Sequence, residues 1–138
     1  MNDCPFCENQ IDRNEVILEN DLCIFLRREN TILIGSGLII PRAHRETAFD
    51  LTPEEWSATH SMIHQAKKLL DETHQPDGYN LGWNCGAVGG QHIFHAHLHI
   101  IPRYKDEPFA GKGFAIGVRK TGVSGFKIQQ LNFEALLV

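Results

Sequence analysis

The sequence has no apolar run long enough to span a membrane and no excess of basic residues. Its 13 Lys and Arg residues stand against 17 Asp and Glu residues, so the net charge of −4 argues against binding the backbone of long nucleic acids. The first ten residues, MNDCPFCENQ, lack the basic and apolar regions of a signal peptide. We therefore expect a cytoplasmic protein that binds neither membranes nor long nucleic acids. Small anionic ligands are compatible with this composition.

Cysteines are also few, and no internal repeat or low-complexity segment is present. Four cysteines in 138 residues do not make a dense disulfide framework. The length fits one domain with one hydrophobic core. We expect residues 1–138 to form that domain, with 105–138 as a peripheral C-terminal tail because its periodicity is weak.

The apolar patterns predict strands, one long helix, and strands again. Segments 15–20 and 21–27 are typical of two strands around a turn, and 31–41, 78–84 and 92–102 of three more. Thr52, Pro53 and Glu55 mark a helix start, and apolar residues continue at helical spacing to Leu70. We predict an α+β fold, in which an antiparallel sheet of about five strands packs with this helix and a short N-terminal helix.

Histidines are concentrated in QHIFHAHLHIIPR, residues 91–103, which holds four of the eight in the chain. His95, His97 and His99 alternate with apolar residues, so in a strand they share one face. Such a row could be a solvated polar face, a set of metal ligands or a catalytic group. Imidazole is the commonest metal ligand, and its unprotonated nitrogen can attack phosphorus at neutral pH.

The pair Cys4 and Cys7 in CPFC has three interpretations: a redox pair, two buried thiols or half of a metal site. The redox interpretation is weak because no βαβ pattern surrounds the pair, and a zinc site would need two further ligands. His60 and His64, four apart on the predicted helix, are interpreted as surface residues because no Glu completes an H-E-x-x-H motif.

Several segments together resemble the histidine triad (HIT) family of nucleotide hydrolases and transferases. The series His-apolar-His-apolar-His-apolar-apolar at 95–101 is similar to the family signature. GLIIPRAH, FDLTPEEW and YNLGWNCGAVGGQ resemble, in the same order, the family's Ile-Pro strand, helix start and Asn and Gly-Gln segment. The resemblance covers roughly residues 4–104, most of the chain, and it implies a HIT-like fold and a homodimer.

The resemblance also implies a chemistry, in which His97 is the nucleophile that attacks the α-phosphorus of a purine nucleotide. A nucleotidyl-histidine would form and then be hydrolysed by water. His99 would contact the phosphate oxygens and leaving group, and Asn84, Gly90 and Gln91 would supply amide groups for them. From spacing alone, the Gly89–Gly90 pair fits a plain hairpin turn and Asn84 a capping side chain equally well.

The implied substrate class leaves the leaving group open between a dinucleoside polyphosphate and a nucleoside phosphoramidate. The match at Gln91 favours the polyphosphate. A non-catalytic regulatory protein that binds nucleotide or zinc is the alternative from another class, because an intact motif does not by itself prove turnover.

A zinc site follows from the same resemblance, to the zinc-containing, bacterial-type branch of the family. In such members a Cys-x-x-Cys pair is completed by a histidine after the Ile-Pro strand and by the first histidine of the triad. The matching residues imply a structural zinc ion bound by Cys4, Cys7, His44 and His95, with no open position for water. In zinc-free members, the residue matching His44 instead orders the triad through hydrogen bonds.

Two positions depart from the family pattern. Arg28 stands where relatives often carry an acidic or amide residue for the ribose hydroxyls, so it is a candidate for a phosphate contact or simply a solvated charge. His92 stands where Ser or Thr is common, and it either contacts the ligand or faces solvent.

Overall fold

The structure, a computed structural model, describes residues 3–28 and 33–114. In this part of the chain, two short 3-10 helices, η1 (Glu8–Gln10) and η2 (Arg13–Glu15), precede the strands β1 (Val16–Glu19), β2 (Cys23–Arg27) and β3 (Gly37–Pro41). A third 3-10 helix, η3 (Ala48–Asp50), leads to the long helix α1 (Pro53–His74), which is followed by β4 (Gly78–Trp83) and β5 (Leu98–Arg103). No helix among the described residues is both long and apolar enough to cross a membrane.

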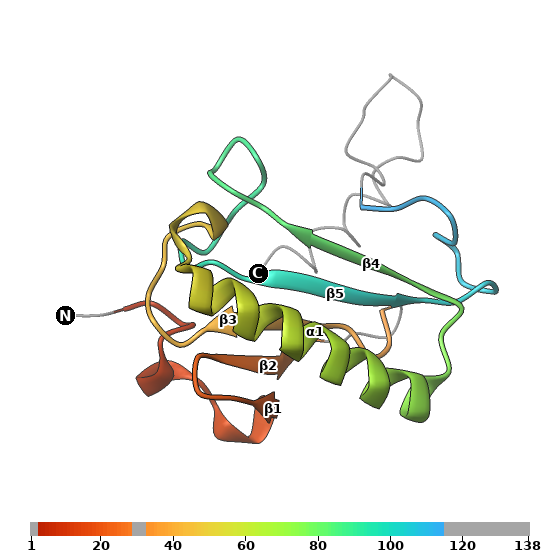
Figure 1. Ribbon diagram of the computed structural model, residues 1–138. Coiled ribbons are helices and arrows are strands. Elements are labelled where there is room, and N and C mark those ends of the chain that lie inside the picture. Colours follow the sequence, from red (N-terminus) through yellow and green to blue (C-terminus); the bar gives the residue numbers. More distant parts are fainter. Residues whose placement is uncertain (1–2, 29–32, 115–138) are drawn as a thin grey trace.

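The five strands form one antiparallel sheet in the order β1-β2-β3-β5-β4, and α1 lies across one face of it (Figure 1). The predicted α+β architecture is confirmed. The short N-terminal helix is replaced by η1 and η2, and residues 115–138 of the predicted tail lie outside the described part of the chain.

The start of α1 is fixed by its sequence. The Thr52 hydroxyl accepts a hydrogen bond from the Glu55 amide at 3.1 Å, while the Glu55 carboxylate accepts one from the Thr52 amide at 2.7 Å. This capping box satisfies two backbone donors that the first helical turn leaves unpaired. The helix ends at His74, and the next residue, Gln75, has a left-handed φ of 47° that stops further helical hydrogen bonding.

The sheet has an apolar cluster on each face. Between α1 and the sheet, Phe25 and Ile39 pack with Met62 and Ala66 of the helix. On the opposite face, Leu26 and Leu38 pack with Phe6 and other residues of the N-terminal segment. Both faces of the sheet are therefore covered, one by α1 and the other by the segment that carries the cysteines.

The last strand is shorter than predicted, because β5 begins at Leu98 and leaves His95 and His97 before it. Continuing the β3–β5 register would pair residue 96 with Pro41, which has no amide to donate. The amide of Ala96 instead donates to the Arg45 carbonyl at 2.6 Å. His99 pairs with Leu38 across the sheet, which puts its side chain on the face opposite α1.

Candidate active site and metal cluster

The three histidines of the row lie together although only His99 belongs to a strand. The imidazole rings of His97 and His99 are 5.1 Å apart between centroids, in an edge-to-face arrangement. All three side chains are buried, with exposed fractions of 0% for His95, 2% for His97 and 3% for His99. A solvated polar face, one of the three interpretations of the row, does not fit this burial.

Backbone carbonyls fix the tautomers of two of these rings. His97 Nδ1 lies 2.8 Å from the His95 carbonyl oxygen, and His95 Nε2 lies 2.8 Å from the carbonyl oxygen of Pro41. Because a carbonyl only accepts hydrogen bonds, each of these nitrogens carries the proton. When the ring is neutral, the lone pair of His97 is therefore on Nε2 and that of His95 is on Nδ1.

His99 is held neutral by its surroundings. Burial, together with the nearby His97, lowers the pKa of His99 from its ordinary value of 6.5 to about 4. Its Nε2 is one of two buried side-chain polar atoms in the described residues without a hydrogen-bond partner. A buried polar atom without a partner is costly, so this nitrogen is a candidate ligand contact.

Cys4, Cys7, His44 and His95 form one cluster, as the family resemblance implies. Their ligand atoms all lie within 4.8 Å of one another. His95 Nδ1 is 3.4 Å from Cys4 Sγ and 3.6 Å from Cys7 Sγ, and His44 Nδ1 is 3.4 Å from Cys7 Sγ. Burial raises the pKa of the Cys4 thiol and lowers that of His95, so without a cation both groups are held neutral.

These distances fit a metal ion. A sulfur at about 2.3 Å and a nitrogen at about 2.0 Å from one tetrahedral zinc ion are about 3.5 Å apart. The proton of His95 is on Nε2, so its Nδ1 faces the thiols as an unprotonated donor. The cluster could therefore hold a metal ion with little rearrangement.

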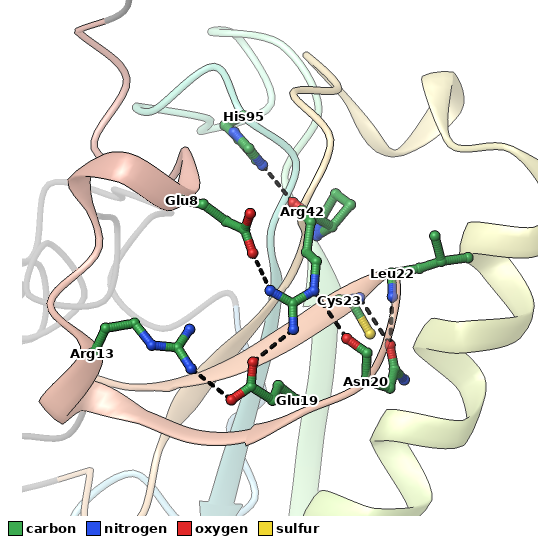
Figure 2. Close-up of polar contacts among 9 residues, drawn as sticks. Glu8, Arg13, Glu19, Asn20, Leu22, Cys23, Arg42 and His95 are labelled. Carbon is green, nitrogen blue, oxygen red and sulfur yellow. Dashed lines mark hydrogen bonds and ion pairs between the residues drawn. The ribbon is translucent and has the colours of Figure 1, made fainter.

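A network around Arg42 fixes the strands and loops that carry the cluster (Figure 2). The Arg42 guanidinium is paired with Glu8, next to Cys7, and with Glu19 at 2.7 Å. It also donates to the Asn20 carbonyl at 2.9 Å. Because Arg42 follows Pro41, whose carbonyl holds His95, the network ties the N-terminal segment to the segment after β3.

The glycine-rich loop at 85–91 is tight and internally bonded. The amides of Gly89 and Gln91 donate to the Gly86 carbonyl at 3.1 and 3.0 Å, and the amide of Gly90 donates to Ala87 at 3.0 Å. A Cβ at Gly89 would lie 2.6 Å from the Cys85 carbonyl oxygen, so this position requires glycine. The backbone amides of Gly90 and Gln91, in the segment where the family resemblance implies phosphate contacts, therefore donate to carbonyls of the loop itself.

The side-chain amides of Gln91 and Asn84 differ in how many hydrogen bonds they form. The Gln91 side chain is buried, its nitrogen donates to the Glu46 and Ile93 carbonyls at 2.7 and 3.0 Å, and its oxygen accepts from Gly86 at 2.8 Å. Among the described residues, the nitrogen of Asn84 makes only a long contact of 3.5 Å, with the Gly90 carbonyl. Asn84 thus keeps donor capacity for a ligand, whereas Gln91 is placed to shape the loop.

The two positions that depart from the family pattern lie differently. His92 is exposed to solvent. Arg28 forms an ion pair with Glu15, and its guanidinium carbon lies 5.8 Å from the centroid of the Phe6 ring. Arg28 is therefore near the row of histidines, with Phe6 between them, but its charge is balanced by Glu15.

Sequence reasoning missed three neighbours of the row. Phe6 packs edge-on against His97. The ring centroid of Phe114 lies 6.3 Å from that of His99, and this phenyl ring fills the space next to Gly82. Arg45, whose carbonyl holds Ala96, is fixed by the Glu55 carboxylate at 2.9 Å. Glu55 was recognisable as part of a helix cap, but no pattern in the sequence indicates its ion pair or the two aromatic contacts.

A family model described as the HIT domain matches residues 9–106 of the chain, more than half of its length. The protein belongs to the HIT family. Among curated HIT relatives, it is 37% identical over 107 residues to Adenylylsulfatase HINT3 of Arabidopsis thaliana, covering 75% of this chain and 53% of that one. It is 32% identical over 74 residues to a Schizosaccharomyces pombe asymmetrical bis(5'-nucleosyl)-tetraphosphatase, covering 54% of this chain and 41% of that protein. The matches thus span about half the length of these two relatives.

Solved structures of HIT proteins share the fold. A HIT family protein from Bacillus anthracis superposes with a TM-score of 0.69 at 33% identity, covering 75% of each chain. A zinc-bound histidine triad family protein from Mycobacterium smegmatis gives a TM-score of 0.68 at 22% identity, covering 97% of this chain and 93% of that one.

Proposed function

We propose that the protein hydrolyses nucleotides at the α-phosphorus through a covalent intermediate on His97, and that its substrate is a dinucleoside polyphosphate. The observation that carries this proposal is the hydrogen bond from His97 Nδ1 to the His95 carbonyl at 2.8 Å. It commits the lone pair of the neutral ring to Nε2, and the adjacent ring of His99 has an Nε2 without a hydrogen-bond partner in the described part of the chain. This combination suits nucleophilic attack on a phosphoryl group.

In the first step, His97 Nε2 bonds to the α-phosphorus while the bond from phosphorus to the leaving-group oxygen breaks. The ring becomes positively charged, and the His95 carbonyl stabilises this charge through the Nδ1 proton. His99 Nε2 and the Asn84 amide would donate hydrogen bonds to the phosphoryl oxygens, where negative charge develops. Gln91 would act by holding the loop that positions Asn84.

In the second step, a water oxygen bonds to the phosphorus and the phosphorus–nitrogen bond breaks. Its electron pair returns to His97 Nε2, one water proton stays on the released nucleoside monophosphate, and the other goes to solvent. His97 and His99 are nearly completely buried, so substrate entry requires their covering side chains to move. Besides His97, Phe114 is a described residue whose ring packs against His99.

The protonation state of His99 supports a polyphosphate as the leaving group. A pKa of about 4 leaves this ring neutral at pH 7, so it is a poor source of a proton for an amine leaving group. A polyphosphate leaves as an anion and needs no proton. We therefore place the anhydride ahead of the phosphoramidate. The fission yeast relative, named for its action on bis-nucleosyl tetraphosphates, supports this order.

We also propose that the Cys4, Cys7, His44 and His95 cluster binds a structural zinc ion, as in the zinc-containing branch of the family. The sulfur–nitrogen separations of 3.4 to 3.6 Å and the unprotonated Nδ1 of His95 support it, and a protein of the same fold is zinc-bound. The bound ion would hold both thiols as thiolates and crosslink the N-terminal segment to the row of histidines. A reducing compartment, such as the cytoplasm, would keep these thiols available.

A homodimer is the proposed assembly. β4 is an outer strand of the described sheet, and it exposes Leu81, which is 46% accessible. Trp56, 43% exposed on α1, packs against Trp83 of β4 with ring centroids 5.5 Å apart. Pairing of two such surfaces would cover these apolar groups. Light scattering of the wild-type protein should give twice the monomer mass. The Leu81→Lys variant should give the mass of one monomer.

A substrate panel tests the proposed activity. The protein is incubated with diadenosine tetraphosphate, adenylyl sulfate and an adenosine phosphoramidate, and AMP is quantified by chromatography. We expect the fastest AMP release from the tetraphosphate, and none with His97→Ala. Nucleotide binding without release from any substrate would contradict the proposal and support a regulatory protein instead. Faster release from the phosphoramidate would overturn the proposed order of leaving groups.

A further inference from the structure

His60 and His64 form a close pair outside the proposed active site. They lie one turn apart on α1, and both side chains are exposed. Their Nε2 atoms are 3.3 Å apart, and the ring centroids are 4.7 Å apart with an interplanar angle of 72°. The hydrolytic mechanism uses neither residue.

The separation of the two nitrogens is at the long end of hydrogen-bond distances, and it also fits one bound ion. Hydrogen bonds from N–H donors to oxygen are most common near 2.9 to 3.0 Å and extend to about 3.2 Å. Two nitrogens at about 2.0 Å from one tetrahedral ion are about 3.3 Å apart, whereas adjacent ligands of a square-planar ion at the same bond length are about 2.8 Å apart. The observed 3.3 Å therefore fits tetrahedral coordination.

The backbone that carries the pair is rigid. The opposite face of α1 is buried at Thr59, Met62 and Ala66, and the capping box fixes its start. Binding an ion therefore requires only the two imidazoles to be held, which limits the entropic cost to their side-chain torsions. Nearby, Lys67 is neutralised by an ion pair with Asp71 at 2.7 Å.

The pair alone supplies two ligands. In the described part of the chain, only the Cys4, Cys7, His44 and His95 cluster brings three or more potential ligands together. Water would therefore complete the coordination at His60 and His64, and the ion there would exchange with solution. Binding should be weaker than at a site with four protein ligands, two of them thiolates.

We propose that His60 and His64 form a second, solvent-exposed site for one zinc ion, bound through both Nε2 atoms. Zinc is the ion of choice because imidazole is a preferred ligand and the ion accepts tetrahedral geometry without a d-electron preference. This site would be independent of the proposed structural zinc and of nucleotide hydrolysis.

The test uses tag-free full-length protein loaded with one equivalent of zinc and titrated calorimetrically with further zinc. We expect a second, weaker binding event. His60→Ala and His64→Ala should each weaken it by about tenfold or more, since a single imidazole remains. His74→Ala, which removes another histidine of α1, is the matched control and should leave it unchanged. Alanine favours helix, so these variants should fold, and circular dichroism checks this.

A parallel titration of Cys4→Ser separates the two sites, because this variant should lose the tight event and keep the weak one. The proposal is overturned if the wild-type protein shows no second event. It is also overturned if that event survives unchanged in His60→Ala and His64→Ala, or if it disappears in His74→Ala.

Discussion

The aromatic ring of Phe6 packs edge-on against the imidazole of His97, with their centroids 5.1 Å apart and an interplanar angle of 70°. Phe6 lies between the two cysteines of the metal cluster and is buried, with 1% of its surface exposed. The segment that would bind zinc therefore also supports the proposed nucleophile. If zinc binds there, we expect it to be coupled to the orientation of His97 through Phe6 as well as through the His95 carbonyl.

Phe6→Leu should reduce turnover even under conditions in which the variant protein is fully folded. The smaller side chain leaves space beside His97, and we expect kcat to fall about tenfold, together with a stability loss of about 1 to 2 kcal/mol. Phe25→Leu is the matched control, because Phe25 is equally buried but packs towards α1. Denaturation and steady-state kinetics of both variants check this. Equal kinetic effects in the two would contradict a positioning role for Phe6.

Arg42→Gln should weaken zinc binding without removing a ligand. The substitution breaks the pairs with Glu8 and Glu19 that hold the N-terminal segment near His44, so the four ligands must be ordered by the ion itself. We expect the zinc affinity to fall about tenfold, measured by competition with a chromophoric chelator. Arg13→Gln, which removes only the outer pair with Glu19, is the control and should retain the wild-type affinity.

His99 should make stability depend on pH in a defined window. Its pKa is about 4 in the folded protein against 6.5 unfolded, so between these values the unfolded chain binds more protons. The contribution is complete above pH 6.5 and declines by up to about 1.4 kcal/mol per pH unit as the pH falls to 4, about 3 kcal/mol in all. Denaturation of wild type and His99→Gln over this range measures it. Parallel curves would contradict the neutral, buried His99.

Gln91 and Asn84 should separate stability from catalysis. Gln91→Leu leaves the Glu46 and Ile93 carbonyls and the Gly86 amide without their partner, so we expect a loss of about 2 kcal/mol. Asn84→Ala removes one long contact and should cost less than about 1 kcal/mol, while turnover falls about a hundredfold. Thermal unfolding measures the stability of both variants, and steady-state kinetics measures their kcat. If Asn84→Ala keeps full activity, Asn84 does not contact the phosphate.

Much of the fold was predictable from local patterns. The capping box at Thr52 and Glu55 defined the helix start, and period-two alternation located the strands before and after the helix. The end of the last strand was predictable, but its beginning was not. Whether residues 92–97 join the sheet depends on where their hydrogen bonds go, and the Arg45 carbonyl takes the Ala96 amide.

Of the candidate site, the grouping of the possible metal ligands was predictable from the family resemblance. Cys4, Cys7, His44 and His95 come together as the family resemblance implies, although they are up to 91 positions apart. The structure adds what composition does not encode: the carbonyls that set the tautomers of His95 and His97, and the internal bonds that occupy Gln91. Such roles depend on tertiary contacts between distant backbone groups, which no short motif specifies.

The most direct test of the central claim is to trap the covalent intermediate. The protein is mixed with diadenosine tetraphosphate, quenched within the first turnover, digested and analysed by mass spectrometry. We predict an adenylyl group on the peptide that contains His97, absent from His97→Ala and present in His74→Ala. An adenylyl group on another residue, or unchanged AMP release by His97→Ala, would contradict the account.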